Sequence, residues 1–500
     1  MGMAPLLPLT LDEASKVLEW PIGVSMALSE LAQGPAISRV SSGEALLDYI
    51  VEMRHRGGMR DAKLPARAVQ GMGLFFRELV PEDFCRGFFG SLLPAMAQLA
   101  LRLSALVKDH IDGSVSDRFP SQLDFLQLRA LPAGQSGMVL LSQELVASIL
   151  ACGFFCLYPS AERNKLDLPD LNFYKLFMAL VDENREESAK HKIICLLHYF
   201  QIVCESVPQG MISYERKVLS LEQEMEDPLS FWSSSSRPLC QILVMEDGTI
   251  EGSDTPVLEV DFANRVLGGG VLGAGCLQEE IRCVINPELI AGRLFLPAMQ
   301  DNEAIEIVGT QCYNRYEGYA SSFRFAGKFF DNKARDAWGR KETHIVAIDA
   351  LPFPGEAQFD AALMLRELNK AYCGFLVHQS IQCGGSSESA RGVATGNWGC
   401  GVFGGDHEVK SMLQWLAASE VSISMSQKFM LWDDEKPLQA GRPFLLYYTF
   451  KDPRTTKLQR IADWILEQKW SVLELWSVLI EYGKGRKYTK VGFFDWLLPD

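Results

Sequence analysis

The chain has 500 residues, 48% of them hydrophobic and 22% charged, which is the composition of an ordinary globular protein. One small hydrophobic core cannot organise a chain of this length, so we expect two domains. The formal net charge of −15 argues against general nucleic-acid binding, because such binding requires a basic surface.

Secretion and membrane insertion are not expected either. Residues 1–5 lack the basic region of a secretory signal, and Leu6 breaks the myristoylation pattern. The longest uncharged apolar stretch, residues 145–161, contains Gly153 and Pro159 and is shorter than the ~20 residues that cross a bilayer. The twelve cysteines show no zinc-like pairing, so we interpret them as free thiols in a reducing, intracellular compartment.

Residues 1–225 are expected to form an all-helical domain. Apolar side chains recur at helical spacing in residues 88–106 and 145–150, and β-branched alternation is scarce. Pro208 and the serine-rich stretch 233–238 fall where this pattern ends, so we place the boundary near residue 225. No cluster of reactive side chains stands out here, and the sequence assigns this half no role beyond support.

Residues 226–500 change to alternating strands and helices, a pattern typical of an α/β layer fold. The runs with strand character are Gln241–Met245, Val257–Phe262, Ala304–Val308, His344–Ile348 and Phe444–Thr449. Two helices are predicted near the end of the chain, over Leu458–Glu467 and Val472–Tyr482, the second stopped by Gly483. Residues 378–391 and 422–441 have the composition of loops.

Residues 260–280 are the most informative part of this half. A strand-like run that carries Asp261 ends at Asn264, and a glycine-rich loop then leads to Gln278-Glu279-Glu280. Glycine lets a ligand approach the main chain, and ligands of open α/β sheets bind beyond the carboxyl ends of strands. Turn chemistry and the first turn of a helix would explain these polar residues equally well if each stood alone.

A second glycine-rich run, Gly396 to Asp406, leads directly into a predicted helix. A strand, a glycine loop and a helix N-terminus together can hold a diphosphate through amide hydrogens. No lysine follows as in a P-loop, which argues against a nucleotide hydrolase of that kind. We interpret Asp406 as the N-cap of the helix, since an anion beside a phosphate is unfavourable.

The block Val260–Ile290 resembles the signature of the poly(ADP-ribose) glycohydrolases, in which a triple glycine is followed after a short spacer by Gln-Glu-Glu. The second glycine run is similar to that family's Asn-Trp-Gly-Cys-Gly-x-Phe-Gly-Gly-Asp loop. The likeness is dense over residues 240–410 and resumes at 444–452. It implies an α/β macrodomain-like fold, a mixed sheet sandwiched by helices, with an all-α accessory domain in front.

The resemblance implies hydrolysis of ribose–ribose O-glycosidic bonds in poly(ADP-ribose), mainly exo from the chain terminus, with release of ADP-ribose. Such a cleavage needs a proton on the leaving oxygen and stabilisation of an oxocarbenium-like centre. Glu280 matches the family's catalytic glutamate, which acts as general acid and then as general base. Glu279 matches its neighbour on a ribose hydroxyl, and Asp261 and Asn264 match positions that contact the terminal ribose and shape the loop.

The resemblance also implies a set of substrate-binding residues. Those expected around the adenine are Gln278, Ile250 and Glu251, although Glu251 also fits an ordinary hairpin. Tyr319 and Phe450 are expected as aromatic walls, with burial in a core as the alternative for each. The loops that would hold the diphosphate and ribose contribute Gly268, Gly269, Gly270, Asn397, Trp398, Gly399, Cys400, Gly401, Phe403 and Gly404.

The expected partners are poly(ADP-ribose) and poly(ADP-ribosyl)ated proteins, in the nucleus, the cytoplasm or both, within the DNA damage response. We expect a monomer that needs no metal or cofactor and binds neither membranes nor specific nucleic-acid sequences. A macrodomain that binds ADP-ribose without cutting it is one alternative, against which the presence of both Glu279 and Glu280 argues. A hydrolase of mono-ADP-ribosylated proteins is the other.

Overall fold

The computed structural model describes residues 6–11, 17–112, 127–220, 227–253, 256–376, 392–421, 444–486, 488 and 490–498. The two stretches predicted to be loops, 378–391 and 422–441, lie outside these residues.

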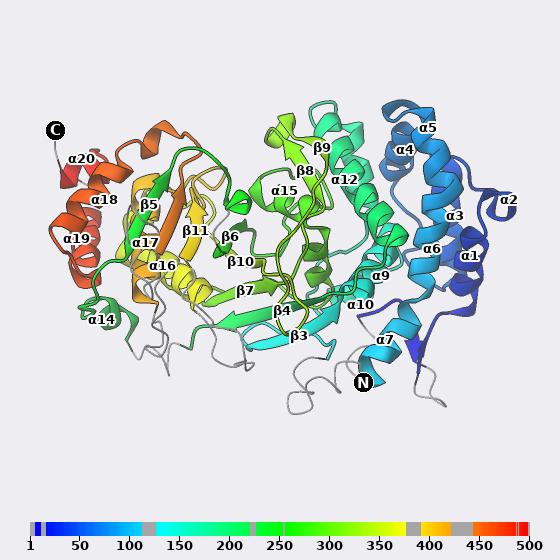
Figure 1. The fold of residues 1–500 in the computed structure, drawn as a ribbon, viewed down its shortest axis with the longest axis horizontal. Coiled ribbons are helices and arrows are strands. Elements are labelled where there is room, and N and C mark those ends of the chain that lie inside the picture. Colours follow the sequence, from blue (N-terminus) through cyan, green and yellow to red (C-terminus); the bar gives the residue numbers. More distant parts are fainter. Residues whose placement is uncertain are drawn as a thin grey trace.

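A mixed sheet of eight strands, in the order β3-β4-β7-β10-β6-β11-β12-β5, forms the centre of the described structure (Figure 1). These strands are β3 Gly137–Ser142, β4 Met211–Val218, β5 Gln241–Met245, β6 Val257–Ala263, β7 Glu303–Val308, β10 His344–Asp349, β11 Gly392–Gly396 and β12 Phe444–Tyr448. From β10 to β5 the neighbouring strands are parallel, so their carboxyl ends share one edge. Strands β7, β4 and β3 continue the sheet by antiparallel pairing.

The N-terminal half is mainly helical and stands at the right of Figure 1. Its longer helices are α1 Ile22–Ala32, α3 Gly43–Arg56, α4 Ala66–Leu74, α6 Leu93–Leu101, α7 Leu103–Asp112, α9 Gln143–Phe154 and α12 Glu186–Glu205. Shorter turns are α2 Pro35–Ser38, η1 Phe75–Leu79, α5 Glu82–Gly87, η2 Phe88–Leu92, α10 Ser160–Asn164, α11 Tyr174–Met178 and η3 Ala179–Val181. A small ribbon pairs β1 Thr10–Leu11 with β2 Leu18–Glu19.

The C-terminal half adds helices on the sheet and a hairpin beside it (Figure 1). The helices are α14 Pro228–Trp232, α15 Gln278–Ile285, α16 Ala361–Phe375, α17 His407–Glu420, α18 Leu458–Glu467, α19 Val472–Gly485 and α20 Phe493–Leu497. The 3₁₀ turns are η4 Ile250–Gly252, η5 Pro287–Leu294, η6 Ala320–Ser322, η7 Gly355–Phe359 and η9 Pro453–Thr455. The hairpin pairs β8 Asn314–Glu317 with β9 Arg324–Lys328.

The two faces of the sheet belong to different cores. Along β10, Ile345 and Ala347 pack with the N-terminal helices, whereas Val346 and Ile348 pack with α16, α17 and α19. This division follows from the two-residue period of a strand, which sends alternate side chains to opposite faces. The helical half therefore covers one face of the sheet directly, and the N-terminal and C-terminal halves share a continuous core.

The predicted macrodomain-like fold is confirmed, and the five predicted strands correspond to β5, β6, β7, β10 and β12. The first 225 residues, however, are not exclusively helical, because β3 and β4 extend the central sheet. The β3 segment is a short apolar run that periodicity cannot assign to helix or strand. The β4 segment forms a strand because it pairs with β7, more than 80 residues further along the chain.

One continuous helical stretch, Glu82–Asp112, is long and apolar enough to cross a membrane by length and composition alone. In its most apolar window, 44% of the residues are buried inside the protein. Leu93, Met96 and Ala97 belong to the core that joins the N-terminal helices to the sheet. A core helix passes the same test, so this stretch is weak support for membrane insertion.

At Gly374, α16 lies in close contact with the sheet. A Cβ atom there would lie 2.7 Å from Cγ2 of Ile348 and 3.3 Å from Cγ2 of Val346. We expect Gly374→Ala to lower the free energy of unfolding by about 1–3 kcal/mol, the usual cost of overpacking. Gly87→Ala is the control, because a Cβ atom at Gly87 has no neighbour within 4 Å. Equal thermal midpoints for the two variants would contradict this account of the packing.

Candidate active site

The predicted site lies where β6 ends and α15 begins. Strand β6 is flanked by β10 and β11, and a loop of residues 264–277 runs from it to α15. Gln278 ties the two elements together: its Oε1 accepts the N–H of Phe262 at 2.8 Å, and its Nε2 donates to the carbonyl of Val260 at 3.2 Å. The Gln278 side chain thus fixes the start of α15 against the edge of the sheet.

Glu279 and Glu280 both accept main-chain N–H groups of this loop. For Glu279, Oε2 accepts from Asn264 at 2.8 Å and Oε1 from Gly268 at 2.7 Å. For Glu280, Oε1 accepts from Gly270 at 2.8 Å and Oε2 from Leu277 at 2.7 Å. Both residues lie in the first turn of α15, and the loop folds over that turn, so neighbouring glutamates on a helix serve one site.

The glycines of the loop are required by space as well as by conformation. A Cβ atom on Gly269 would lie 2.5 Å from Oε2 of Glu279 and 2.6 Å from Oε1 of Glu280. One on Gly275 would lie 2.6 Å from the same oxygen of Glu280. Gly268 and Gly269 also have positive φ, of +79° and +44°. Any larger residue at 269 or 275 would therefore displace a carboxyl group. The sequence pattern alone could not show this spatial requirement.

Asp261 completes a cluster of three carboxyl groups. It lies in β6 with 2% of its surface exposed, and its Oδ1 has no hydrogen-bond partner in the described structure. Burial raises the pKa of Asp261 to about 7, with Arg282 opposing and Glu280 reinforcing the shift. Burial, Asp261 and Glu280 together raise the pKa of Glu279 well above its usual range. Asp261 and Glu279, the two neighbours of Glu280, therefore keep their protons to a higher pH than isolated carboxyl groups do.

The second glycine run forms a loop between β11 and α17. Some of the side chains predicted to contact the ligand point into the protein instead. The Trp398 side chain is fully buried and donates to the carbonyl of Ile348 at 2.9 Å. Asn397 donates to the carbonyl of Thr449 at 2.9 Å and accepts from the Tyr447 hydroxyl at 3.1 Å. Cys400 is buried as well. The Trp398, Asn397 and Cys400 side chains support the loop from inside.

Other residues of this loop are open to solvent. A Cβ atom on Gly401 or Gly404 would meet nothing within 4 Å, and Gly404 has a φ of +72°. Gly399, in contrast, is crowded: it has positive φ, and a Cβ atom there would lie 2.5 Å from the Cβ atom of Ala350.

The prediction for Asp406 is confirmed: it is the N-cap of α17, and its carboxylate accepts the N–H of Val409 at 3.0 Å.

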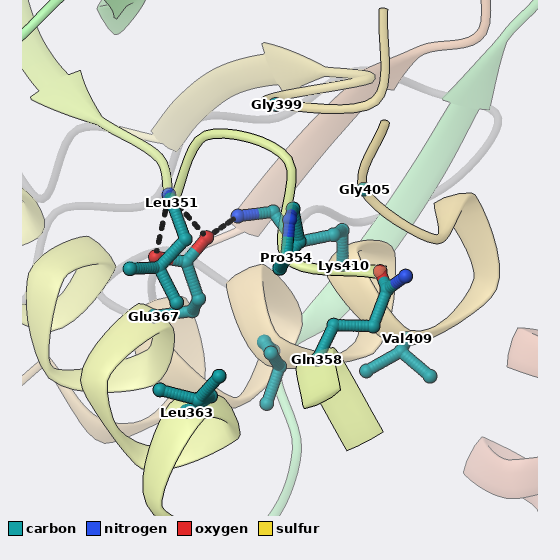
Figure 2. A pocket seen from close by; sticks show the side chains of 10 residues that line it. Leu351, Pro354, Gln358, Leu363, Glu367, Gly399, Gly405, Val409 and Lys410 are labelled. Atoms are coloured by element: carbon teal, nitrogen blue, oxygen red, sulfur yellow. Dashed lines mark hydrogen bonds and ion pairs between the residues drawn. The ribbon is translucent and has the colours of Figure 1, made fainter. Parts of the chain in front are cut away.

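Figure 2 shows a small cavity beneath this loop. Its volume is about 10 Å³, room for no more than a water molecule, so it is a packing feature and not a substrate site. Glu367 accepts the N–H of Leu351 at 3.2 Å and forms an ion pair with Lys410. The Lys410 ammonium lies 3.3 Å from the centroid of the Trp398 ring. This buried ion pair and cation–π contact hold the loop in place from below.

The two predicted aromatic walls, Tyr319 and Phe450, both lie at the protein surface. Tyr319 is 53% exposed and Phe450 is 44% exposed, so burial in a core does not explain either residue. The Tyr319 hydroxyl lies against the main chain of Gln278, and the Phe450 ring reaches Gly396, where β11 ends. Phe403 is partly buried, with its ring 6.1 Å from that of Phe353.

Two of the three residues expected at the adenine, Ile250 and Glu251, have contacts within the protein. Ile250 is buried in a small cluster with Val257 and Tyr448. The carboxylate of Glu251 accepts the hydroxyl of Tyr316 at 2.5 Å. Ile250 is thus a core residue at the base of the region, while Glu251 is fixed by the β8–β9 hairpin.

Sequence reasoning missed the residues that hold the first glycine loop from behind. Lys192, on α12, donates to the carbonyls of Val271, Gly273 and Gly275 at 3.0, 2.7 and 2.5 Å. Burial lowers the pKa of Lys192 to about 8, against the attraction of Cys276 and Glu280. The available signal was a lysine in register with Cys195, Leu196 and Tyr199 on the apolar face of α12.

Two arginines support the same loop. Arg185, beside the start of α12, donates to the carbonyl of Ala274 at 2.9 Å. Arg293, in η5, donates to the carbonyls of Leu267 and Gly269 at 2.7 and 3.3 Å. Among the residues that the structure describes, no group of three or more His, Cys, Asp and Glu side chains is arranged to hold a metal.

The described structure combines a mixed sheet, buried carboxyl groups at the end of a central strand, two glycine loops and a helical half against one face of the sheet. These features define the class of the protein as a macro-type hydrolase with a helical domain. Sequence comparison agrees with this class. The family model for the poly(ADP-ribose) glycohydrolase macro domain fold matches residues 229–457, and that for the helical domain matches residues 80–216.

Curated relatives extend the match over the whole chain. Poly(ADP-ribose) glycohydrolase 1 of Arabidopsis thaliana is 41% identical, in an alignment that covers 100% of this chain and 96% of that protein. The probable poly(ADP-ribose) glycohydrolase 2 of the same plant is 39% identical over 98% of this chain and 97% of its own. Poly(ADP-ribose) glycohydrolase 1 of Caenorhabditis elegans is 33% identical over 61% of this chain and 37% of its own. The chain belongs to the poly(ADP-ribose) glycohydrolase family, and it is a hydrolase that acts on poly(ADP-ribose).

The loop geometry gives a matched pair of glycine variants. We expect Gly275→Ala to lower kcat for poly(ADP-ribose) hydrolysis by about 100-fold, since a small displacement of a catalytic group has an effect of that size. Gly273→Ala should remain close to the parental rate, because the nearest neighbour of its Cβ atom would be 3.6 Å away. Initial rates of both purified proteins at saturating polymer make the comparison. Equal rates would show that contact between residue 275 and Glu280 does not matter.

The buried Asp261 predicts a pH-dependent change in stability. The pKa of Asp261 rises from 3.8 to about 7 on folding, so between these values the folded chain binds more protons than the unfolded chain. Stability from this residue therefore falls as pH rises from 4 to 7. Asn cannot ionise, so Asp261→Asn should have a higher thermal midpoint than the parent at pH 8, and the difference should shrink toward pH 5. A difference that grows at low pH would contradict the assignment.

Proposed function

We propose that this hydrolase works mainly from the terminus of poly(ADP-ribose), releases ADP-ribose, and uses Glu280 as general acid and then as general base. The observation that carries the proposal is the placement of the Glu280 carboxyl on the glycine loop. As a residue, Glu280 is 8% exposed, against 4% for Glu279 and 2% for Asp261, so it is the most accessible residue of the cluster.

The contacts of Glu280 suit a group that gains and loses a proton. It gives its proton to the 2′-oxygen that leaves as the bond between the two riboses breaks, while positive charge develops at the anomeric carbon. The carboxylate so formed accepts the N–H groups of Gly270 and Leu277 and faces the developing charge. It then takes a proton from the water that attacks the anomeric carbon, which restores the acid.

The neighbouring groups are proposed to position the terminal ADP-ribose. Glu279 hydrogen-bonds a ribose hydroxyl, and Asp261 is its buried neighbour, with a pKa raised by burial. The open glycines of the second loop, Gly401 and Gly404, hold the diphosphate through main-chain N–H groups. The exposed rings of Tyr319 and Phe450 form the walls of the site.

Charge supports attack at the chain end. The chain carries a formal net charge of −15, so its surface as a whole repels a polyanion. Uncharged main-chain N–H groups can still hold one diphosphate in a glycine-lined site, where their alignment is fixed before the ligand arrives. A long basic track for the remainder of the polymer is not needed if only the terminal unit is bound.

Glu280→Gln tests the catalytic assignment. The substitution is close to isosteric but removes the transferable proton, so turnover should fall by at least ~1,000-fold while the Kd for ADP-ribose stays close to the parental value. Initial rates on poly(ADP-ribose) and calorimetric titration with ADP-ribose measure the two quantities. Glu467→Gln, at the exposed end of α18, is the matched control and should keep the parental rate.

Product analysis on polymer of defined length tests the direction of attack. ADP-ribose should be the main early product while long chains shorten gradually. Early release of oligomers would instead indicate internal cleavage. Retention of polymer without any ADP-ribose release would establish a binding protein. Release of ADP-ribose from mono-modified proteins in preference to polymer would establish a hydrolase of mono-ADP-ribosylated proteins.

A further inference from the structure

The first glycine loop is held on its outer side by cations that bind its carbonyl oxygens. Lys192 binds those of Val271, Gly273 and Gly275, and Arg185 binds that of Ala274. Both residues come from the helical half, from α12 and the residue before it. Successive carbonyls of the loop are thereby turned toward α12.

The same loop segment shapes the contacts of Glu280. The carbonyl of Gly270 accepts the N–H groups of Gly273 and Gly275 at 2.9 and 3.1 Å, while the N–H of Gly270 goes to Glu280 at 2.8 Å. Gly275 also lies against the Glu280 carboxyl, where no Cβ atom fits. Gly273 and Gly275 thus take part in both sets of contacts, with the Lys192 ammonium on one side and the surroundings of Glu280 on the other.

The position of Lys192 is well defined relative to α15. Asn314 bridges the two helices, since its Nδ2 donates to the carbonyls of Cys195 on α12 and Val284 on α15, at 3.1 and 2.8 Å. His191 accepts the N–H of Phe325 at 3.2 Å, which fixes α12 to the β8–β9 hairpin. The ammonium is therefore presented to the loop by a helix that is tied to the helix bearing Glu280.

Burial of the charged Lys192 ammonium has a high cost in desolvation free energy. Its side chain is 0% exposed, and within the described part of the chain it forms no ion pair with a carboxylate. Its three N–H bonds are matched by three carbonyl oxygens of one loop. An apolar side chain would avoid the cost of desolvating a charge, but it would leave the three carbonyl oxygens without this donor.

We propose that Lys192 is a positioning residue for poly(ADP-ribose) hydrolysis, which holds the 271–275 segment in the path that places the carboxyl group of Glu280. The helical half is then a part of the catalytic apparatus, because it supplies this cation. The inference rests on the proposed role of Glu280.

Lys192→Met is the first test, because methionine keeps an unbranched chain and removes the ammonium. We expect kcat on poly(ADP-ribose) to fall by about 10- to 100-fold, while the Kd for ADP-ribose changes by less than about threefold, as for loss of a contact that matters in the transition state. Rates are referred to active sites counted by calorimetric titration with ADP-ribose, so that a loss of folded protein does not count as a loss of kcat. Amide hydrogen exchange should rise in the peptide that covers residues 267–277.

Lys190→Met is the matched control on the same helix. Lys190 is more exposed, and among the described residues its ion-pair partner is Glu187, at 3.5 Å, so this variant should keep the parental kcat and the parental exchange of the loop. A parental kcat for Lys192→Met, per folded site, would overturn the proposal. So would an equal loss of kcat for Lys190→Met.

Lys192→Arg tests the positioning role of Lys192 if the Lys192→Met variant does not fold. Arginine keeps the charge but donates from a planar fork, which cannot reproduce three bonds from one tetrahedral ammonium. We expect a folded protein with a kcat between those of the parent and Glu280→Gln, and a parental kcat would contradict the proposal. A parental kcat for Glu280→Gln would refute the proposed function, whereas loss of activity there with full activity of both Lys192 variants would refute this inference alone.

Discussion

The burial of three carboxyl groups beneath one glycine loop is the constraint on which the site depends. A buried carboxylate is costly unless hydrogen bonds compensate for the lost water. Here the main-chain N–H groups of the loop provide four such bonds, two to Glu279 and two to Glu280. They can point inward only along a path that brings the Cα atoms of Gly269 and Gly275 against the carboxyl oxygens. The glycines, the carboxyls and the loop conformation therefore require one another.

The helical half follows from the same constraint. A loop that turns its N–H groups inward turns its carbonyls outward, and buried carbonyls need donors of their own. Lys192 and Arg185 supply them from the N-terminal half, and Arg293 from η5. Because β3 and β4 also extend the central sheet, the two halves share a core, a sheet and the rear wall of the site. The helical half is therefore joined to the candidate site by individual hydrogen bonds.

The second glycine loop differs from the first in which of its groups face the solvent. Its Asn397, Trp398 and Cys400 side chains turn inward, and Trp398 lies against the ammonium of Lys410, whereas Gly401 and Gly404 are left open. The first loop thus surrounds side-chain carboxyls, whereas the second leaves its main chain accessible. This difference fits a site in which one loop holds the reacting groups and the other holds an anionic part of the substrate through its main chain.

The sequence by itself determined the strands β5, β6, β7, β10 and β12, the two glycine loops and the cap at Asp406, and its motifs determined the family. These features depend on local patterns, namely alternation, glycine content and side-chain caps, that a short segment carries alone. Only the tertiary structure decided that β3 and β4 join the sheet, that Asn397 and Trp398 point inward, and that Lys192 reaches a loop 81 residues away. Such contacts depend on which distant segments meet. The apolar face of α12 marks Lys192 as a buried residue, but no local pattern shows that this face meets α15 and the first glycine loop.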